Sequence, residues 1–168
     1  MHQWGMRSPR IVFLTDLPLE LEHAPVSRLY HLASICAGRG MDAELIGCES
    51  PSRLQSDAFT ITALPVKSPG KSQALVPFRQ EVGRALKQAD AVVVRGYFIA
   101  SWVLGAARRQ QVPLRMLDFH GSTWREKAGK PLVRSVSKWL EQRSFMAATH
   151  ILSVSKGCAG DGGGAHRV

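Results

Sequence analysis

The sequence predicts an α/β domain built on a doubly wound, mostly parallel sheet. Short apolar runs of strand length alternate along the chain with apolar residues at helical spacing. This β-α-β-β-α-β-α-β-α-β order is typical of parallel strands covered by helices on both faces. The 168 residues, of which 45% are hydrophobic and 21% charged, are enough for one ordinary folded core.

The first half of the chain predicts a β-α-β unit followed by an edge strand. Residues 10–16 form a compact apolar run that ends in polar residues, which indicates a buried strand. Residues 25–37 carry apolar side chains at helical spacing, with a proline in the first turn and glycines after the end. Residues 42–47 form the second strand, and the alternating run 59–64 indicates a third strand nearer the edge.

The second half alternates helix and strand. The predicted elements are, in order, a helix at 78–86, a strand at 91–94, a helix at 99–109, a strand at 114–118, a helix at 132–147 and a strand at 151–155. The helix at 132–147 has its apolar spacing at Val133, Val136, Leu140 and Ala147. We therefore expect a folded domain over residues 10–157, after a disordered lead at 1–9. A disordered tail is expected at 158–168, because its glycine-rich composition is too poor in apolar residues to pack.

The cysteines and the apolar runs limit the compartment. The three cysteines, Cys36, Cys48 and Cys158, are odd in number and match no metal-ligand spacing. We therefore expect no metal site and a reducing compartment, the cytoplasm. No apolar run approaches the ~20 residues that span a bilayer, and the first ten residues lack the apolar core of a secretory signal.

The formal net charge of +9 implies an anionic partner, which is a nucleic acid, an acidic membrane face or a phosphorylated substrate, and charge alone does not choose between them. A basic stretch near the C-terminal end has Trp124, Leu132 and Trp139 close by, which makes an anionic membrane surface a candidate partner. Its cationic members are Lys127, Lys130, Arg134 and Lys138. A solvated helix face is the simpler interpretation. No nucleic acid is expected, because the chain shows no helix-turn-helix or zinc pattern and no aromatics interleaved on a sheet face.

Two phosphate-binding motifs are disfavoured by the residues that the sequence has in place of their glycines. Residues 68–72 resemble the end of a P-loop, but Pro65 stands where the first glycine is needed, and a proline removes a backbone N–H from the phosphate cradle. The loop after the first strand, residues 17–23, has no glycine, so a dinucleotide site of the usual kind is not expected.

Polar residues gather where four predicted strands end, and such ends line one crevice in a doubly wound sheet. The candidate cleft residues are Asp16, Arg95, Tyr97, Asp118, His120, Gly121, Ser122, Ser155 and Lys156. His120 suits a hydrogen bond to a sugar hydroxyl, and Arg95 or Lys156 suits a phosphate. The alternative is that each residue only marks where a strand reaches water.

Several segments, in this order, resemble the N-terminal domain of a GT-B glycosyltransferase of the family 4 type. They are IVFLTD at 11–16, RLYHLA at 28–33, GRGMDAEL at 38–45, ADAVVV at 89–94, DFHG at 118–121, Glu141, and ATHILSVS at 148–155. The resemblance covers residues 10–157 and implies a Rossmann-like fold that forms one half of a GT-B enzyme.

The resemblance implies transfer of a sugar from a nucleotide-sugar to an acceptor hydroxyl, with retention at the anomeric carbon. The N-terminal domain of the family mainly binds the acceptor, here a glycan or a lipid-linked or cell-envelope molecule. The family histidine after the fifth strand maps onto His120, which would orient the transferred sugar. No cofactor is expected on this domain alone, and the nucleotide-sugar would bind the full-length enzyme. The family also implies a cytoplasmic location, peripheral on the cytoplasmic face of the membrane.

The sequence departs from the family pattern in two places. Glu20, Leu21, Glu22 and His23 stand where the family usually has glycines near the donor phosphates. The C-terminal donor-binding domain with its E-x7-E pair is absent after residue 157. We therefore expect a truncated, inactive fragment that lacks this domain or a partner subunit. The alternative is a stand-alone α/β binding module that docks on a partner subunit or an anionic membrane.

Overall fold

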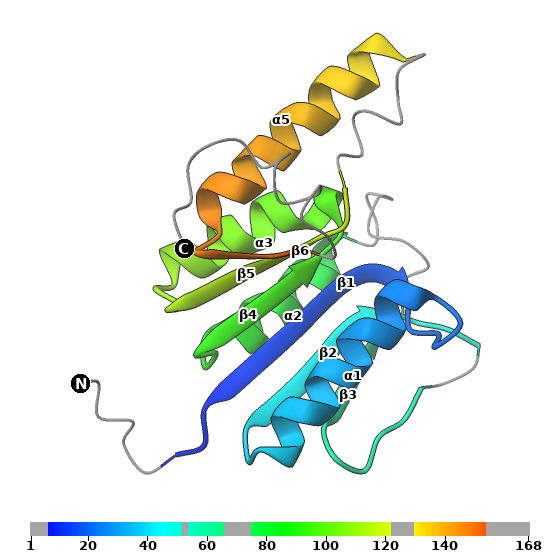
Figure 1. Ribbon diagram of the computed structural model, residues 1–168, viewed down its shortest axis with the longest axis vertical. Helices are drawn as coiled ribbons and strands as arrows, with labels where there is room; N and C mark the ends of the chain where they lie inside the picture. The colour runs from blue at the N-terminus through cyan, green and yellow to red at the C-terminus, as the bar shows by residue number, and fades with distance from the viewer. Residues whose placement is uncertain (1–6, 52–53, 66–74, 122–129, 154–168) are drawn as a thin grey trace.

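A six-stranded, all-parallel sheet forms the centre of the computed structural model, in the strand order β3-β2-β1-β4-β5-β6 (Figure 1). The structure describes residues 7–51, 54–65, 75–121 and 130–153. The strands are β1 (Arg10–Pro18), β2 (Asp42–Cys48), β3 (Thr60–Leu64), β4 (Ala91–Arg95), β5 (Leu114–Phe119) and β6 (His150–Ser153). The helices in the described ranges are α1 (Ala24–Gly38), α2 (Leu75–Leu86), α3 (Tyr97–Arg109) and α5 (Pro131–Ala147).

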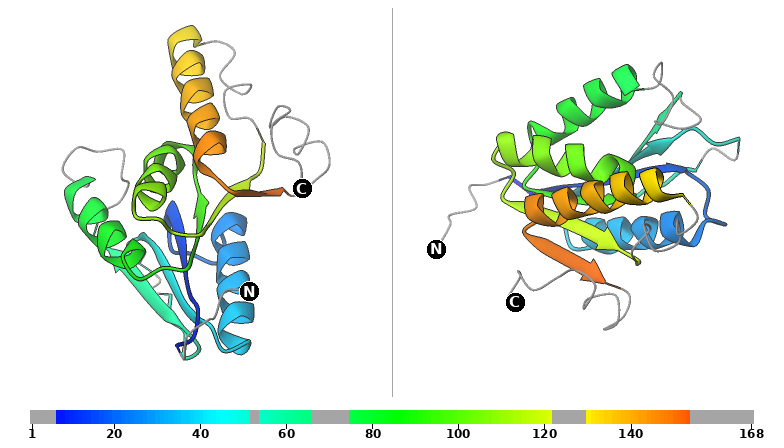
Figure 2. Two further views of the ribbon diagram at one scale, coloured as in Figure 1. Left: turned by 90° about the vertical axis from the view of Figure 1, so that its left-hand side faces the viewer. Right: turned by 90° about the horizontal axis from the view of Figure 1, so that it is seen from above.

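The doubly wound α/β prediction is confirmed, and so is the edge position of β3. The chain forms β1, α1 and β2 and then adds β3 at the edge of the sheet. It then crosses through α2 to the other side of β1, where it forms β4. As a result, α1 covers one face of the sheet while α2 and α3 cover the other (Figure 2). The reversal of strand order between β1 and β4 is the topological switch point, outside which ligands bind in such sheets.

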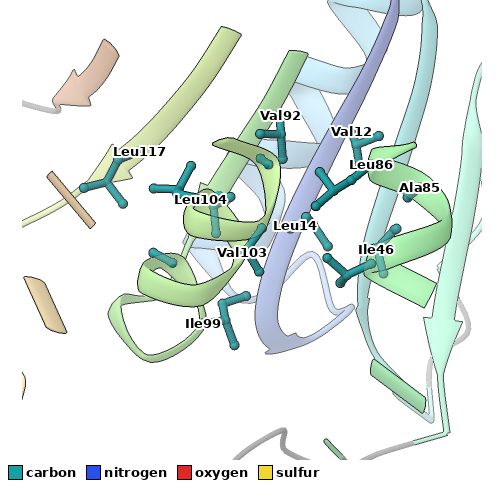
Figure 3. Close-up of a cluster of buried hydrophobic side chains, with 14 of the residues drawn as sticks. Val12, Leu14, Ile46, Ala85, Leu86, Val92, Ile99, Val103, Leu104 and Leu117 are labelled. Carbon is teal, nitrogen blue, oxygen red and sulfur yellow. The ribbon is translucent and has the colours of Figure 1, made fainter. Parts of the chain in front are cut away.

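Alternation along β1 divides the core between the two faces. Ile11 and Phe13 join the cluster under α1, whereas Val12 and Leu14 join the cluster under α2 and α3 (Figure 3). Successive strand residues point to opposite faces, so one apolar run supplies both cores. This explains why the central strands are almost continuously apolar, as expected for parallel strands buried on both sides.

A buried ion-pair cluster centres on Glu44 of β2, whose side chain is only 2% exposed. Its Oε2 atom lies 2.5 Å from Arg10 Nη2, and its Oε1 atom accepts hydrogen bonds from Arg84 Nη2 at 2.6 Å and Thr62 Oγ1 at 2.8 Å. A buried carboxylate is tolerated when its oxygens are hydrogen-bonded and its charge is paired. Glu44 therefore joins β1, β2, β3 and α2.

The buried face of α5 differs from the one that its apolar spacing suggests. Val133 and Val136 are 44% and 48% exposed, although Ala147 is buried as expected. The buried polar residues of the helix are Ser137, Glu141 and Ser144. Residues 131–136 are all exposed, because the first half of α5 extends beyond the sheet, while the second half packs on α3 (Figure 1). Small polar side chains fit that contact and the adjoining pocket.

Element boundaries shift by a few residues. β1 continues to Pro18, and α2 begins at Leu75 rather than at residue 78, which places Pro77 in its first turn, where a proline is tolerated. Arg7, in the sequence segment predicted as a lead, forms an ion pair of 2.9 Å with Asp90. Residues 1–6, the P-loop-like segment 68–72 and the tail 158–168 lie outside the described residues. Within the described ranges, every helix is too short or too polar to cross a membrane.

Candidate functional site

The switch point brings Asp16 of β1 against Gly96, which follows β4. Gly96 has a φ of 103°, and a Cβ atom at this position would collide with the Asp16 carboxylate. Only glycine adopts that backbone conformation without strain and leaves room for the side chain beside it. Gly96 is also the N-cap residue of α3, so the close approach lets the helix begin directly at the edge of the sheet.

Next to the switch point, a cavity of about 140 Å³ lies at the carboxyl ends of β4 and β5 and is bounded on one side by α5. Its polar lining comes from three elements that are distant in the sequence. The lining residues are Arg95, Gly96, Leu117, Asp118, Phe119, His120, Gly121, Glu141 and Ser144. This cavity is the candidate site.

Asp118 is the centre of the site, and its side chain is fully buried. Its Oδ2 atom lies 2.8 Å from Arg95 Nη1 and 3.0 Å from His120 Nε2, and its Oδ1 atom lies 3.3 Å from Arg28 Nη2. Arg95 and Asp118 are register partners in β4 and β5, which places them side by side. Asp118 and His120 are two residues apart, the spacing at which strand side chains point to the same face. The carboxylate thus links α1, β4 and the end of β5.

His120 is held as a neutral imidazole at pH 7. Burial lowers its pKa, the cations of Arg95 and Arg28 lower it as well, and the Asp118 carboxylate opposes them without reversing the shift. A neutral imidazole that bonds a carboxylate through Nε2 carries its proton on Nε2. In this tautomer, which we infer from the hydrogen bond, Nδ1 is an acceptor suited to a hydroxyl group.

We expect His120 to titrate below pH 6.5, the usual value for histidine. Because the folded pKa is lowered, the unfolded chain binds more protons in this range. The contribution of His120 to stability is therefore complete above pH 6.5 and is lost as the pH falls through the unfolded and then the folded pKa. Proton NMR of the His120 Cε1–H against pH, with His120→Gln to assign the signal, measures the midpoint. A midpoint at or above 6.5 would contradict the neutral imidazole.

A second group of titratable residues lies at the end of β1. Burial raises the pKa of the Asp16 carboxyl, although a backbone hydrogen bond and Arg95 counteract it. Burial, followed by the charge of Asp16, raises the pKa of the Cys48 thiol to about 11, and Cys48 Sγ donates to the Asp16 carbonyl oxygen at 3.4 Å. The thiolate is the nucleophilic form of cysteine, so Cys48 is protonated and unreactive at neutral pH.

The structure brings four of the predicted cleft residues together in the cavity, namely Arg95, Asp118, His120 and Gly121. Asp16 lies beside Gly96 without lining the cavity, and Tyr97 is the first residue of α3. The side chain of Tyr97 and all of Ser122, Ser155 and Lys156 lie outside the described residues. Of the four cationic residues predicted to bind an anionic surface, Lys130, Arg134 and Lys138 are exposed at or on α5 and do not line the cavity. Lys127 lies outside the described residues.

Three polar residues of the site were not predicted. Arg28 reaches Asp118 from α1, and no local pattern indicates this contact, because the two residues are far apart in the sequence. Glu141 and Ser144 line the cavity from α5. The sequence contains a signal for Glu141 and Ser144. Together with Ser137 they follow at spacings of four and three residues, which places polar side chains on one helix face. Within the described ranges, no group of three or more metal-ligating residues comes together.

The open parallel sheet, with helices on both faces and a polar cavity outside its carboxyl ends, defines this protein as a Rossmann-like α/β domain. Residues 24–161 match the family model of the glycosyl transferase 4-like domain. The chain therefore belongs to the glycosyl transferase 4-like family, which confirms the resemblance seen in its sequence. A search of curated proteins finds no match to the chain.

Proposed function

We propose that this domain binds the acceptor in a retaining glycosyltransferase, which moves a sugar from a nucleotide-sugar to a hydroxyl of a glycan or of a lipid-linked or cell-envelope acceptor. The observation that carries the proposal is the buried Asp118 carboxylate, which orients a neutral His120 in the cavity at the end of β5. The second support is membership of a glycosyltransferase family.

The size of the cavity favours part of a sugar over a complete donor. Pockets that bury a whole drug-sized ligand have volumes of ~300–1,000 Å³, whereas this cavity measures about 140 Å³. A hydroxyl-bearing edge of one sugar ring fits in that space, and a complete nucleotide-sugar would extend beyond it. We therefore assign the cavity to the transferred sugar and the acceptor hydroxyl where they meet.

The charge of the cavity favours hydroxyl groups over phosphate. Its lining holds one guanidinium, from Arg95, and two carboxylates, from Asp118 and Glu141, beside the neutral His120. Arg95 is already paired with Asp118 at 2.8 Å. Because its guanidinium is engaged by Asp118, Arg95 offers a phosphate little positive charge, whereas carboxylate oxygens accept hydrogen bonds from sugar hydroxyls, which are donors as well as acceptors.

In this proposal, His120 orients the sugar. With the Nε2 proton bonded to Asp118, its Nδ1 atom accepts a hydrogen bond from one sugar hydroxyl. A fixed hydrogen bond of this kind holds the reacting groups in one geometry, which lowers the entropic part of the barrier. Asp118 is a positioning residue, because it acts on the sugar only through His120.

Binding of the nucleotide part of the donor requires, in our proposal, a second domain or a partner subunit. The loop after β1, residues 19–23, has no glycine that would let backbone N–H groups approach a phosphate closely. The cavity, with a volume of about 140 Å³, would also leave the nucleotide outside it. We therefore expect the 168-residue chain alone to show no sugar transfer and weak or no binding of UDP-glucose or GDP-mannose.

Titration of the chain with methyl α-glucoside, methyl α-mannoside and N-acetylglucosamine tests the acceptor-side role. We expect at least one glycoside to shift the amide resonances of His120 and Gly121 in a saturable way. His120→Ala is expected to weaken that glycoside about tenfold, the value of one hydrogen bond, whereas His31→Ala, on the exposed surface of α1, is expected to leave it unchanged. Absence of shifts with every glycoside, or tight UDP-glucose binding by the chain, would contradict the proposal.

A further inference from the structure

The two carboxylate oxygens of Asp118 have different partners. Oδ2 accepts hydrogen bonds from Arg95 Nη1 at 2.8 Å and from His120 Nε2 at 3.0 Å. Oδ1 lies 3.3 Å from Arg28 Nη2, and no hydrogen-bond donor among the described residues reaches it. Because the Asp118 side chain is fully buried, Oδ1 depends on the positive charge of Arg28 for its stabilisation.

The position of Arg28 is fixed by helix α1. Its near neighbours Val26 and Leu29 are fully buried in the core between α1 and the sheet, which fixes the backbone at this point. The Arg28 side chain is 34% exposed and reaches Asp118 without lining the cavity. Arg28 can therefore affect a ligand in the cavity only through Asp118.

We propose that Arg28 is a positioning residue, which fixes the plane of the Asp118 carboxylate so that Oδ2 accepts the hydrogen bond from His120 Nε2. The torsion that turns a carboxylate about its Cβ–Cγ bond has broad energy minima, so partners on one oxygen alone leave the plane poorly defined. Arg95 and His120 both bind Oδ2. The charge of Arg28 beside Oδ1 supplies the second point that defines the plane.

The geometry of the Arg28–Asp118 contact favours positioning over support of the fold. Arginines that bind carboxylates strongly form two parallel hydrogen bonds, whereas this contact is a single approach of 3.3 Å. An arginine that is one-third exposed can also be solvated when its partner is lost, so the pair adds little to stability. We therefore expect Arg28 variants to change the state of His120 while the urea midpoint stays close to that of the wild type.

Long-range proton–nitrogen correlation NMR of the whole chain above pH 7 tests the proposal, because it shows which ring nitrogen of His120 carries the proton. The wild type is expected to show the Nε2–H tautomer. Arg28→Met and Arg28→Gln remove the charge and are each expected to give a mixture of the Nε2–H and Nδ1–H tautomers. Arg28→Lys keeps the charge and is expected to restore the wild-type spectrum, because the single contact does not use the planar fork of arginine.

Arg39→Met is the matched control, since it makes the same substitution at the exposed C-terminal end of α1. We expect it to leave the His120 tautomer unchanged. The proposal would be overturned if folded Arg28→Met and Arg28→Gln kept the wild-type tautomer. A mixture of the same size in Arg28→Lys or in Arg39→Met would overturn it as well.

The consequence for sugar binding rests on the proposed function. Arg28→Met is expected to weaken a glycoside that binds the wild type about threefold, less than His120→Ala does, because it disturbs the orientation of the imidazole and leaves the imidazole in place. A tautomer that changes with no effect on glycoside affinity would contradict this consequence. The tautomer measurement contains no sugar, so a chain that binds no glycoside would count against the proposed function and leave the test of Arg28 intact.

Discussion

Replacing Asp118 by alanine is expected to lower the free energy of unfolding by about 3–5 kcal/mol, the cost of leaving a buried charge without its partner. The side chain of Arg95 is only 14% exposed and would lose its carboxylate at 2.8 Å. Arg28 would lose its contact at 3.3 Å, and His120 would lose the hydrogen bond that orients its ring. The site would therefore lose stability and geometry together.

Urea denaturation measures the stability of this variant, and Asp118→Asn provides a milder comparison that keeps the shape of the side chain. The Asp118 carboxylate raises the pKa of His120 against burial and two arginines. Removing its charge is therefore expected to lower the pKa of His120 further, which proton NMR detects in the folded Asn variant. A His120 titration that does not move would show that Asp118 only supports the fold.

Replacing Glu44 by alanine is expected to have the second largest effect, about 3 kcal/mol of lost stability, again because a buried pair is broken from one side. Arg10, with a side chain 16% exposed, would lose its more buried partner and keep only the ion pair with Asp42 at 2.7 Å. Arg84 is 51% exposed and can turn to water, so it adds little to the loss. The remainder comes from Thr62, whose hydroxyl would lose its acceptor.

The Glu44 variant is also a control for the site. Glu44 faces the cluster beneath α2, away from the cavity, and its partners Arg10, Thr62 and Arg84 do not line that cavity. We therefore expect Glu44→Ala to lower the urea midpoint while the His120 titration and glycoside binding stay as in the wild type. If Glu44→Ala moved the His120 midpoint as much as Asp118→Asn does, the Asp118 effect would be a general response to lost stability.

Most of the fold was predictable because its elements depend on residues close in the sequence. The alternation that sends Val12 to one core and Phe13 to the other is visible in β1 alone. The grouping of Arg95, Asp118 and His120 was also predictable, because the carboxyl ends of parallel strands meet at one edge. The proximity of Asp118 and His120 follows from a spacing of two residues across the end of β5.

Other parts of the site depend on contacts between distant segments. The ion pair between Arg28 and Asp118 joins α1 to β5. The sequence around either residue gives no indication of this contact. The burial of Glu141 among basic residues has the same origin, since it results from the position of α5 against α3 and the end of β5. A buried carboxylate of this kind is stabilised only by partners that the folded chain supplies.

The sequence by itself determined the helices and strands, the doubly wound α/β class and the strand ends that carry polar groups. These features follow from local periodicity and from the general rules of parallel sheets. Only the tertiary structure decided which side of α5 is buried. Burial of an apolar side chain such as Val136 would lower the free energy of the folded chain on either side of the helix. The packing of α5 on α3 nevertheless turns Ser137, Glu141 and Ser144 inward. Val136 and Trp139 are thereby left exposed, on the side of the helix away from the cavity.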